Sequence, residues 1–281
     1  MALAVARRLG DVELVSIDSM QVYRGMDIGT AKPSSGEQAE IRHHLIDLVE
    51  PTHDFTVAEF QVSYTSVVDS IGERGRRALL VGGTGLYHRV VIDDFELPGE
   101  WPDVRTEIDA EEDTAALFAR LSDLDPAAAR KMEPSNRRRV ARALEVTIGS
   151  GRPFSSFGPG VDNYLPSAVT QIGLRWPRDV LTDRIAERVH RMIDAGLIAE
   201  VDALGDLSRT AAQALGYKEI LEALDGRINQ DEAIEMIIAR TRKFAVRQER
   251  WFRRDPRVRW IEVEHDPVAE AAPAVIAALH P

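Results

Sequence analysis

The chain has 281 residues, of which 44% are hydrophobic, and it contains no cysteine. Its length allows one large domain or two smaller ones, and the lack of cysteine excludes disulfides, thiolate zinc sites and a cysteine nucleophile. The formal charge of −11 argues against nucleic-acid binding by the surface as a whole, although clustered Lys and Arg residues can still bind phosphates. No apolar run approaches the roughly 18 residues of a membrane span, so we expect a cytoplasmic protein without a membrane segment.

The first expected strand leads to an acidic residue. Residues 2–9 have the pattern of a helix end with Gly10 as its stop, and the apolar run at residues 12–17 has the length of a strand. Asp18 then stands at the carboxyl end of that strand, before a polar loop, which is where α/β proteins usually bind ligands. Asp18 is therefore the first catalytic candidate. The alternative is that it only caps the turn after the strand.

Two neighbouring histidines, His43 and His44, suggest a metal site at first. Neighbours on a strand point to opposite faces of the sheet, so one ion is not easily held by both side chains. We therefore favour hydrogen-bonded structural histidines over metal ligands, and expect no metal site formed by the protein alone.

The next segments have the order strand, helix, strand. Thr56 and Glu59 have the spacing of a capping box and predict a helix that runs to about Ser70. A strand at residues 78–81 follows and ends in a Gly-Gly-Thr-Gly turn at residues 82–85. This order predicts a parallel sheet. The glycines of the turn either let a ligand approach the backbone or simply form a tight turn.

Residues 98–166 differ from the rest of the chain in sequence pattern: they predict short helices, separated by Pro and Gly residues and by acidic turns. They predict a helical subdomain inserted into a core formed by residues 1–97 and 167–281. Arginines at positions 137–139 and 142 lead into a helix whose Val140, Ala143 and Leu144 can pack inward. The arginines then face outward, either toward phosphates or as ordinary solvated surface.

Two helices in the last third of the chain present basic side chains. The first, after a strand at residues 169–174, carries Arg184, Arg188 and Arg191 on one face. The last long helix begins near residue 230 and carries a basic stripe, formed by Arg240, Lys243, Arg247, Arg250 and Arg254.

The basic stripe has Trp251 and Phe252 beside it. This combination suits RNA, because phosphates need positive charge and unstacked bases need flat partners. A helix neutralised by internal salt bridges is less favoured, since Glu235 and Glu249 are the nearby acids along it.

Seven short motifs, in order along nearly the whole chain, together resemble those of the tRNA dimethylallyltransferases, also called tRNA isopentenyltransferases. Any one motif is weak, but seven in sequence are specific. They are Asp18-Ser19-Met20-Gln21-Val22-Tyr23, Asp27-Ile28-Gly29-Thr30-Ala31-Lys32-Pro33, His43-His44-Leu45-Ile46-Asp47, Gly82-Gly83-Thr84-Gly85-Leu86-Tyr87, Arg142-Ala143-Leu144-Glu145-Val146, Leu215-Gly216-Tyr217-Lys218-Glu219 and Arg247-Gln248.

The resemblance implies an α/β fold, with a P-loop NTPase-like parallel sheet flanked by helices and an inserted helical subdomain. It implies transfer of a dimethylallyl group from dimethylallyl diphosphate to N6 of the adenosine 3′ of the anticodon, by a monomer that binds the tRNA anticodon stem-loop. Asp18 would be the general base for the amine and Thr84 a second catalytic residue. The departing diphosphate would need Mg²⁺ and basic groups, for which Arg184 and Arg188 are candidates.

The tRNA contacts that the resemblance implies include the glycine turn and both basic segments. They are Asp18, Ser19, Met20, Gln21, Thr84, Arg105, Arg138, Arg139, Val140, Ala141, Arg142, Gln213, Ala214, Leu215, Gly216, Tyr217, Lys218, Val246, Arg247, Gln248, Glu249, Arg250, Trp251, Phe252 and Arg253.

The chain departs from the family pattern in three places. Ser135-Asn136 replaces the usual Asn-Asp before the arginines, and the lack of cysteine excludes the zinc finger of many eukaryotic members, so the chain resembles the shorter bacterial form. The family's first strand and its P-loop, Gly-x-x-x-x-Gly-Lys-Ser/Thr, are missing before residues 2–9. We therefore expect that Met1 is not the true start and that residues 1–281 alone are a poor catalyst, which the upstream coding sequence and an activity assay would test.

Two other functions fit parts of the sequence. A P-loop-type small-molecule kinase fits the strand and helix order but not the basic stripe. A catalytically inactive tRNA-binding remnant fits a chain that lacks the phosphate loop.

Overall fold

The structure is a computed structural model that describes residues 1–158, 160 and 162–279. It divides into two compact units, one formed by residues 1–93 and 166–281 and the other by residues 94–165. The boundaries expected from the sequence, after residues 97 and 166, lie close to these. Within the described residues, no helix combines the length and the apolar character needed to cross a bilayer.

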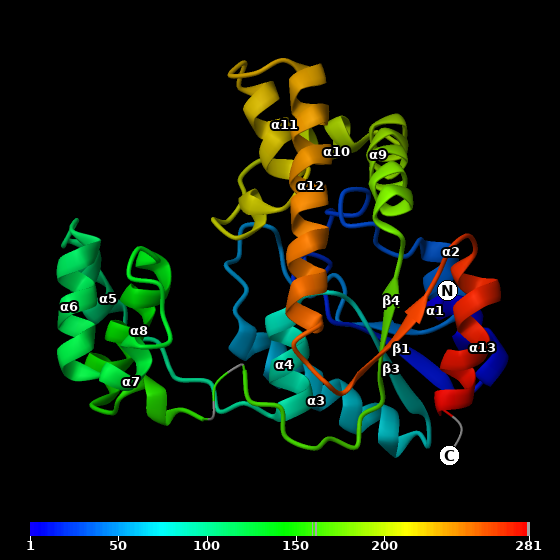
Figure 1. Ribbon diagram of the computed structural model, residues 1–281. Coiled ribbons are helices and arrows are strands. Elements are labelled where there is room, and N and C mark those ends of the chain that lie inside the picture. The colour runs from blue at the N-terminus through cyan, green and yellow to red at the C-terminus, as the bar shows by residue number, and fades with distance from the viewer. Residues whose placement is uncertain (159, 161, 280–281) are drawn as a thin grey trace. The chain divides into compact units, whose positions relative to one another are not determined.

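The first unit contains two parallel sheets (Figure 1). Strand β1, Val12–Ser16, lies between β2, His43–His44, and β3, Arg77–Val81. A separate parallel pair is formed by β4, Gln171–Arg175, and β5, Val258–Glu262. The prediction of a parallel sheet is therefore confirmed. Strand β4 begins two residues later than expected, and Val169 before it is exposed.

Helices cover both faces of β1, which is buried along its whole length. On one face Val15 shares a core with Phe60 and Tyr87, and on the other Leu14 packs with Ala6. The helices of this unit are α1 (Ala2–Leu9), α2 (Ser35–Glu40), α3 (Val57–Glu73), α4 (Gly85–Asp93), α9 (Arg178–Asp194), α10 (Leu197–Ala203), α11 (Tyr217–Leu224), α12 (Gln230–Phe252) and α13 (Pro267–Leu279), with a 3₁₀ turn, η2, at Ala211–Gln213.

Local capping signals fix several helix ends. Gly10 ends α1 in the left-handed conformation with φ 74°, and the Thr56–Glu59 capping box begins α3, as predicted. Helix α3 runs to Glu73 rather than to Ser70, because Gly72 is accommodated inside the helix and the chain turns only at Gly75, with φ 66°.

The second unit is helical, as the sequence predicts. Its core is formed by fully buried side chains such as Ile108, Leu121 and Leu144, and the expected inward face of the arginine-rich helix is confirmed. Its elements are α5 (Pro102–Asp109), α6 (Thr114–Leu124), α7 (Pro126–Ala129), α8 (Arg137–Ser150) and a 3₁₀ turn, η1, at Phe154–Ser156.

Helices α9 to α12 lie together beyond the carboxyl end of β4 (Figure 1). Strand β4 leads almost directly into α9, and α12 packs against α9, α11 and α4. This arrangement brings the last long helix to the edge of the sheet at which β1 delivers Asp18.

Candidate active site

Asp18 follows β1 and is mostly enclosed by protein. Its Oδ1 accepts the backbone N–H of Met20 at 2.8 Å, so the residue does cap the turn after the strand. Burial raises the pKa of the Asp18 carboxyl, and the N–H groups of Met20 and Gln21 and the charge of Arg188 act in the opposite direction. A carboxylate with a raised pKa is a better proton acceptor, so the turn cap and the general base are compatible roles of one residue.

Thr84 joins the turn after β3 to the residue that follows Asp18. Its Oγ1 accepts the backbone N–H of Ser19 at 3.0 Å and lies 3.3 Å from the Ser19 hydroxyl. Thr84 therefore fixes the backbone next to Asp18, and the structure brings both predicted catalytic residues to one place.

The side chain of Gln21 is engaged inside the protein. Its Oε1 accepts the hydroxyl of Ser16 at 2.8 Å, and its Nε2 donates to the carbonyls of Thr30 and Ala31 at 3.2 and 3.4 Å. The amide thus ties the end of β1 to the loop around residue 30, and the Gln21 backbone stays beside Asp18.

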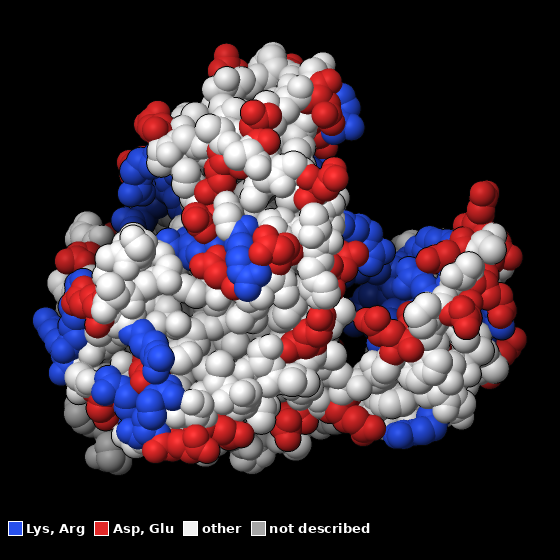
Figure 2. Space-filling model, turned by 180° about the vertical axis from the view of Figure 1, so that it is seen from behind, with Lys and Arg blue, Asp and Glu red and all other residues white. Residues whose placement is uncertain are grey.

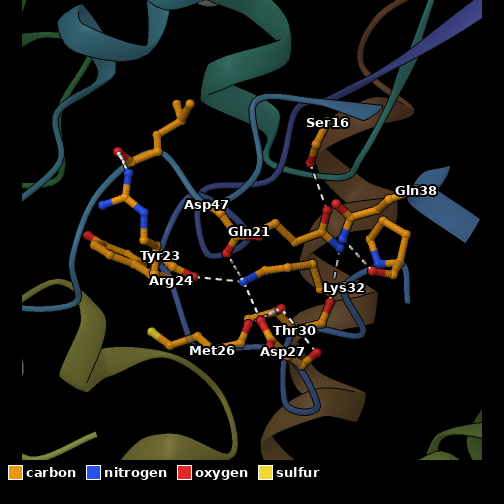
Figure 3. A network of polar contacts seen from close by, with 12 residues as sticks. Ser16, Gln21, Tyr23, Arg24, Met26, Asp27, Thr30, Lys32, Gln38 and Asp47 are labelled. Atoms are coloured by element: carbon orange, nitrogen blue, oxygen red, sulfur yellow. Dashed lines mark hydrogen bonds and ion pairs between the residues drawn. The ribbon is translucent and has the colours of Figure 1, made fainter. Parts of the chain in front are cut away.

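Lys32 holds the same loop from its other side (Figure 3). Its ammonium, on a side chain only 2% exposed, donates to the Tyr23 carbonyl at 2.8 Å and to Asp27 and Asp47 at 2.6 Å each. Asp47 has the left-handed φ of 54°, which is uncommon for a residue with a side chain. A strained backbone conformation persists where surrounding contacts hold it in place, and the bond from Lys32 to the Asp47 side chain is such a contact.

We expect Lys32→Met to lower the free energy of unfolding by about 1–3 kcal/mol, because it leaves a carbonyl and two facing carboxylates without their cation. Urea denaturation measures this loss. The matched control is Arg7→Met, which removes an exposed, solvent-screened ion pair with Glu40 and should lower the free energy of unfolding much less. Equal losses in the two variants would contradict the importance of the buried ammonium.

Glu200 was not selected from the sequence, yet it anchors this loop. Its carboxylate accepts the backbone N–H groups of Asp27, Ile28 and Gly29 at 3.0, 2.7 and 3.3 Å. It also accepts the hydroxyl of Tyr217 at 2.6 Å. The three backbone partners lie 171 to 173 positions before Glu200 in the chain, so no local pattern could have indicated this residue.

Tyr217 is fully buried, so its side chain is a support of the loop rather than a surface that RNA can touch. Burial and Glu200 raise the pKa of its phenol, which stays protonated and able to donate. A Cβ on Gly29 would lie 2.4 Å from the Tyr217 ring, which explains the glycine. Of its neighbours in the predicted RNA-binding segment, Ala214 and Gly216 are buried, Leu215 and Lys218 are partly exposed, and Gln213 is exposed.

The Gly-Gly-Thr-Gly turn packs against α12. A Cβ on Gly83 would lie 1.9 Å from Nε2 of Gln248, and a Cβ on Gly85 would lie 2.3 Å from Nε1 of Trp251. Gln248 Nε2 also donates to the Gly83 carbonyl at 3.0 Å. These two glycines therefore make room for side chains of α12. The sequence had suggested room for a ligand or a tight turn instead.

The basic stripe is only partly available to a ligand. Arg240 donates to the fully buried Glu219 of α11 at 2.5 Å, so an acid outside the helix neutralises one end of the stripe. The acids of α12 itself do not pair with Arg240, and Glu219 lies on a different helix, so the acids along α12 gave no sign of this ion pair. Lys243, Arg247 and Arg250 are exposed and form no ion pair with other described residues.

Acidic and basic side chains are unevenly distributed on the surface. On the face that Figure 2 shows, Asp and Glu are scattered at many positions, whereas Lys and Arg gather in a few clusters. The net charge of −11 therefore leaves room for local basic surfaces.

Two arginines of α9 were candidates for the diphosphate. The guanidinium of Arg184 stacks on the Trp176 ring at 4.0 Å from its centroid. Arg188 reaches solvent but has protein on several sides, which lowers its pKa, and its charge acts on Asp18. Of the two, Arg188 is the one that influences the candidate base.

The predicted RNA contacts of the second unit surround a buried carboxylate. Glu145 accepts Arg142 at 2.7 Å and the backbone N–H of Trp101 at 3.0 Å, and lies 3.7 Å from Arg105. Arg138 and Arg139 are exposed. Val140 and Ala141 have no exposed area, so their side chains face the core of this unit and not RNA. Asn136 caps α8 by accepting the Arg139 N–H, so the altered motif keeps its cap.

The histidine pair is hydrogen-bonded, as favoured from the sequence. His43 Nδ1 lies 2.7 Å from the Ile41 carbonyl, and His44 Nε2 lies 2.6 Å from Glu13 Oε2. Arg74 and His44 together lower the pKa of Glu13 to about 2. Among the residues that the structure describes, no three His, Asp or Glu side chains converge as metal ligands.

Comparison with known proteins gives consistent matches. The family model described as IPP transferase matches residues 21–255. A tRNA dimethylallyltransferase of Pseudarthrobacter chlorophenolicus is 46% identical over 270 residues, which cover 93% of this chain and 89% of that protein. One of Bifidobacterium longum subsp. infantis is 43% identical over 285 residues, covering 99% of this chain and 86% of that protein.

Two solved structures are similar as well. The tRNA isopentenylpyrophosphate transferase of Bacillus halodurans has 40% identity and a TM-score of 0.70, covering 99% of this chain and 91% of that chain. A eukaryotic dimethylallyltransferase described as acting on tRNA has a TM-score of 0.82 at 23% identity, covering 98% of this chain and 74% of that chain, and so shares the fold.

Proposed function

This chain belongs to the IPP transferase family, and on that premise we propose that it transfers a dimethylallyl group to an adenosine of tRNA. The finer proposal is that dimethylallyl diphosphate is the donor and that N6 of the adenosine 3′ of the anticodon is the acceptor. The observation that carries it is Asp18, a carboxylate with a raised pKa held at the strand end by Thr84 and Gln21.

Asp18 serves as the proton acceptor in this reaction. The amine nitrogen forms a bond to the first carbon of the dimethylallyl group while the bond from that carbon to the diphosphate oxygen breaks. An exocyclic amine on a purine is a poor nucleophile, and removal of its proton by Asp18 prevents a charged nitrogen from accumulating. The Met20 N–H on Oδ1 fixes the orientation of the carboxylate.

Diphosphate departure calls for positive charge, and we propose that Mg²⁺ is bound with the donor. The described residues present no group of three metal-ligating carboxylates or histidines, so they do not form a cage for the ion. Mg²⁺ commonly binds through substrate phosphates and water, which is compatible with this arrangement. Within the described residues, Arg188 of α9 is the basic group that we assign to the diphosphate, because its charge already reaches Asp18.

The pH dependence tests the assignment of Asp18. The base acts only when it is ionised, so turnover falls as the pH drops through its raised pKa. In Arg188→Met the loss of a positive charge raises that pKa further, and we expect the acid limb of the kcat profile to move to higher pH. Arg191→Met is the control and should leave the limb in place. An unchanged limb in Arg188→Met would reject the electrostatic coupling.

The proposed function has a direct test. The purified protein is incubated with unmodified tRNA, Mg²⁺ and dimethylallyl diphosphate, and the nucleosides are analysed by mass spectrometry. Prenylated adenosine is the expected product. Its absence with intact tRNA binding would instead support an inactive tRNA-binding protein, and binding of labelled ATP in place of the prenyl donor would support a kinase.

A further inference from the structure

An exposed aromatic residue lies on α12 among the basic side chains. Phe244 is 40% exposed, although a phenyl ring normally gains free energy by burial. The buried residues of α12 are Ala233 and Ile237, both nearer its N-terminus. Phe244 lies beyond these buried residues, and its ring is left partly uncovered by the protein.

The position of Phe244 relates it to the site of Asp18. Phe244 and Gln248 are four residues apart and so share one face of the helix, about 6 Å apart along its axis. Gln248 donates to the Gly83 carbonyl, and the adjoining Thr84 accepts the N–H of Ser19. Phe244 thus lies one helical turn from a chain of contacts that ends beside the candidate base.

The surroundings of Phe244 favour an anionic partner with flat groups. Lys243 precedes it, and the guanidinium of Arg247 lies 5.9 Å from the centroid of its ring. An apolar protein partner would have to strip water from two cations to reach the ring, which is costly. A single-stranded nucleic acid meets both needs, since its bases stack on aromatic rings while its phosphates contact Lys and Arg.

We propose that Phe244 is the platform on which an anticodon-loop base next to the acceptor adenosine stacks. This inference rests on the proposed function, because it takes tRNA as the substrate. Asp18 acts on the acceptor adenosine itself. Because Phe244 lies one helical turn from Gln248, we assign its ring to a neighbouring base. Unstacking of the loop exposes the faces of both bases, and Phe244 replaces the lost stacking partner.

Binding of a fluorescently labelled anticodon stem-loop RNA, followed by anisotropy, tests this role. We expect Phe244→Ala to raise the Kd about tenfold and Phe244→Tyr to stay within about twofold of wild type, since tyrosine keeps the aromatic face. The control is Val62→Ala, which truncates another exposed apolar side chain, 73% exposed on α3, and should not alter the Kd.

RNAs with an abasic nucleotide on one or the other side of the acceptor identify the stacked base. On the RNA that lacks this base, wild type should bind about tenfold more weakly, and Phe244→Ala should cause no further loss. A Kd of Phe244→Ala equal to that of Val62→Ala would overturn the proposal. It would also be overturned if Phe244→Ala raised the Kd about tenfold, relative to wild type, on both abasic RNAs. Product analysis on the same samples is separate: binding without prenylation would reject the proposed reaction and not the stacking role.

Discussion

Asp18→Asn is expected to lower kcat by about 10²–10⁴-fold while the Kd for tRNA changes by no more than a few-fold. Asparagine has nearly the same shape as aspartate and its side-chain oxygen can still accept the Met20 N–H, so the turn after β1 is retained. What is lost is the capacity to take up the proton of the attacking amine. Single-turnover rates with saturating donor, together with tRNA binding by anisotropy, measure the two effects separately.

The split between rate and affinity is the decisive feature of this experiment. If Asp18→Asn weakens tRNA binding as much as it lowers the rate, then Asp18 is a binding residue. Thr84→Val provides a comparison, because it removes the hydroxyl that holds Ser19 and leaves the base itself in place. We expect a smaller loss of kcat in Thr84→Val than in Asp18→Asn, and the acid limb of its pH profile should persist.

Gly82→Ala is expected to damage both folding and turnover. A Cβ at this position would lie 2.6 Å from the carbonyl oxygen of Ile17 and 2.7 Å from its carbonyl carbon. These are backbone atoms at the end of β1, where Ile17 N–H also donates to the Val81 carbonyl at 2.8 Å, so they cannot move aside as a flexible side chain would. Overpacking of this kind costs about 1–3 kcal/mol of the free energy of unfolding, and it displaces the residue before Asp18.

A matched substitution separates this steric effect from the general effect of replacing glycine. Gly72 lies inside α3, and a Cβ added there has no atom within 4 Å. Gly72→Ala should therefore raise the free energy of unfolding by about 0.5–1 kcal/mol, because alanine favours the helix. Urea denaturation and kcat corrected for the folded fraction are measured in both variants. A Gly82→Ala protein with normal stability and turnover would show that the end of β1 can adjust.

The sequence predicted those parts of the fold that depend on short-range signals. The capping box at Thr56 begins α3, Gly10 ends α1, and the apolar run before Asp18 forms the central strand β1. Each of these elements is specified by residues within a few positions of one another, through hydrogen bonds or periodic burial that the local pattern displays. The same reasoning placed Asp18 at a strand end, and the ordered motifs identified the family.

Only the tertiary structure decided what several of the selected residues contact. Gly83 and Gly85 accommodate Gln248 and Trp251, and Arg240 is neutralised by Glu219 of another helix. Glu200, which holds the loop after Asp18, has partners more than 170 positions away. A glycine or a carboxylate has the same local pattern whether it meets a ligand, a helix or a distant backbone. The packing of segments far apart in the chain selects among these contacts, and no short window of sequence contains both partners.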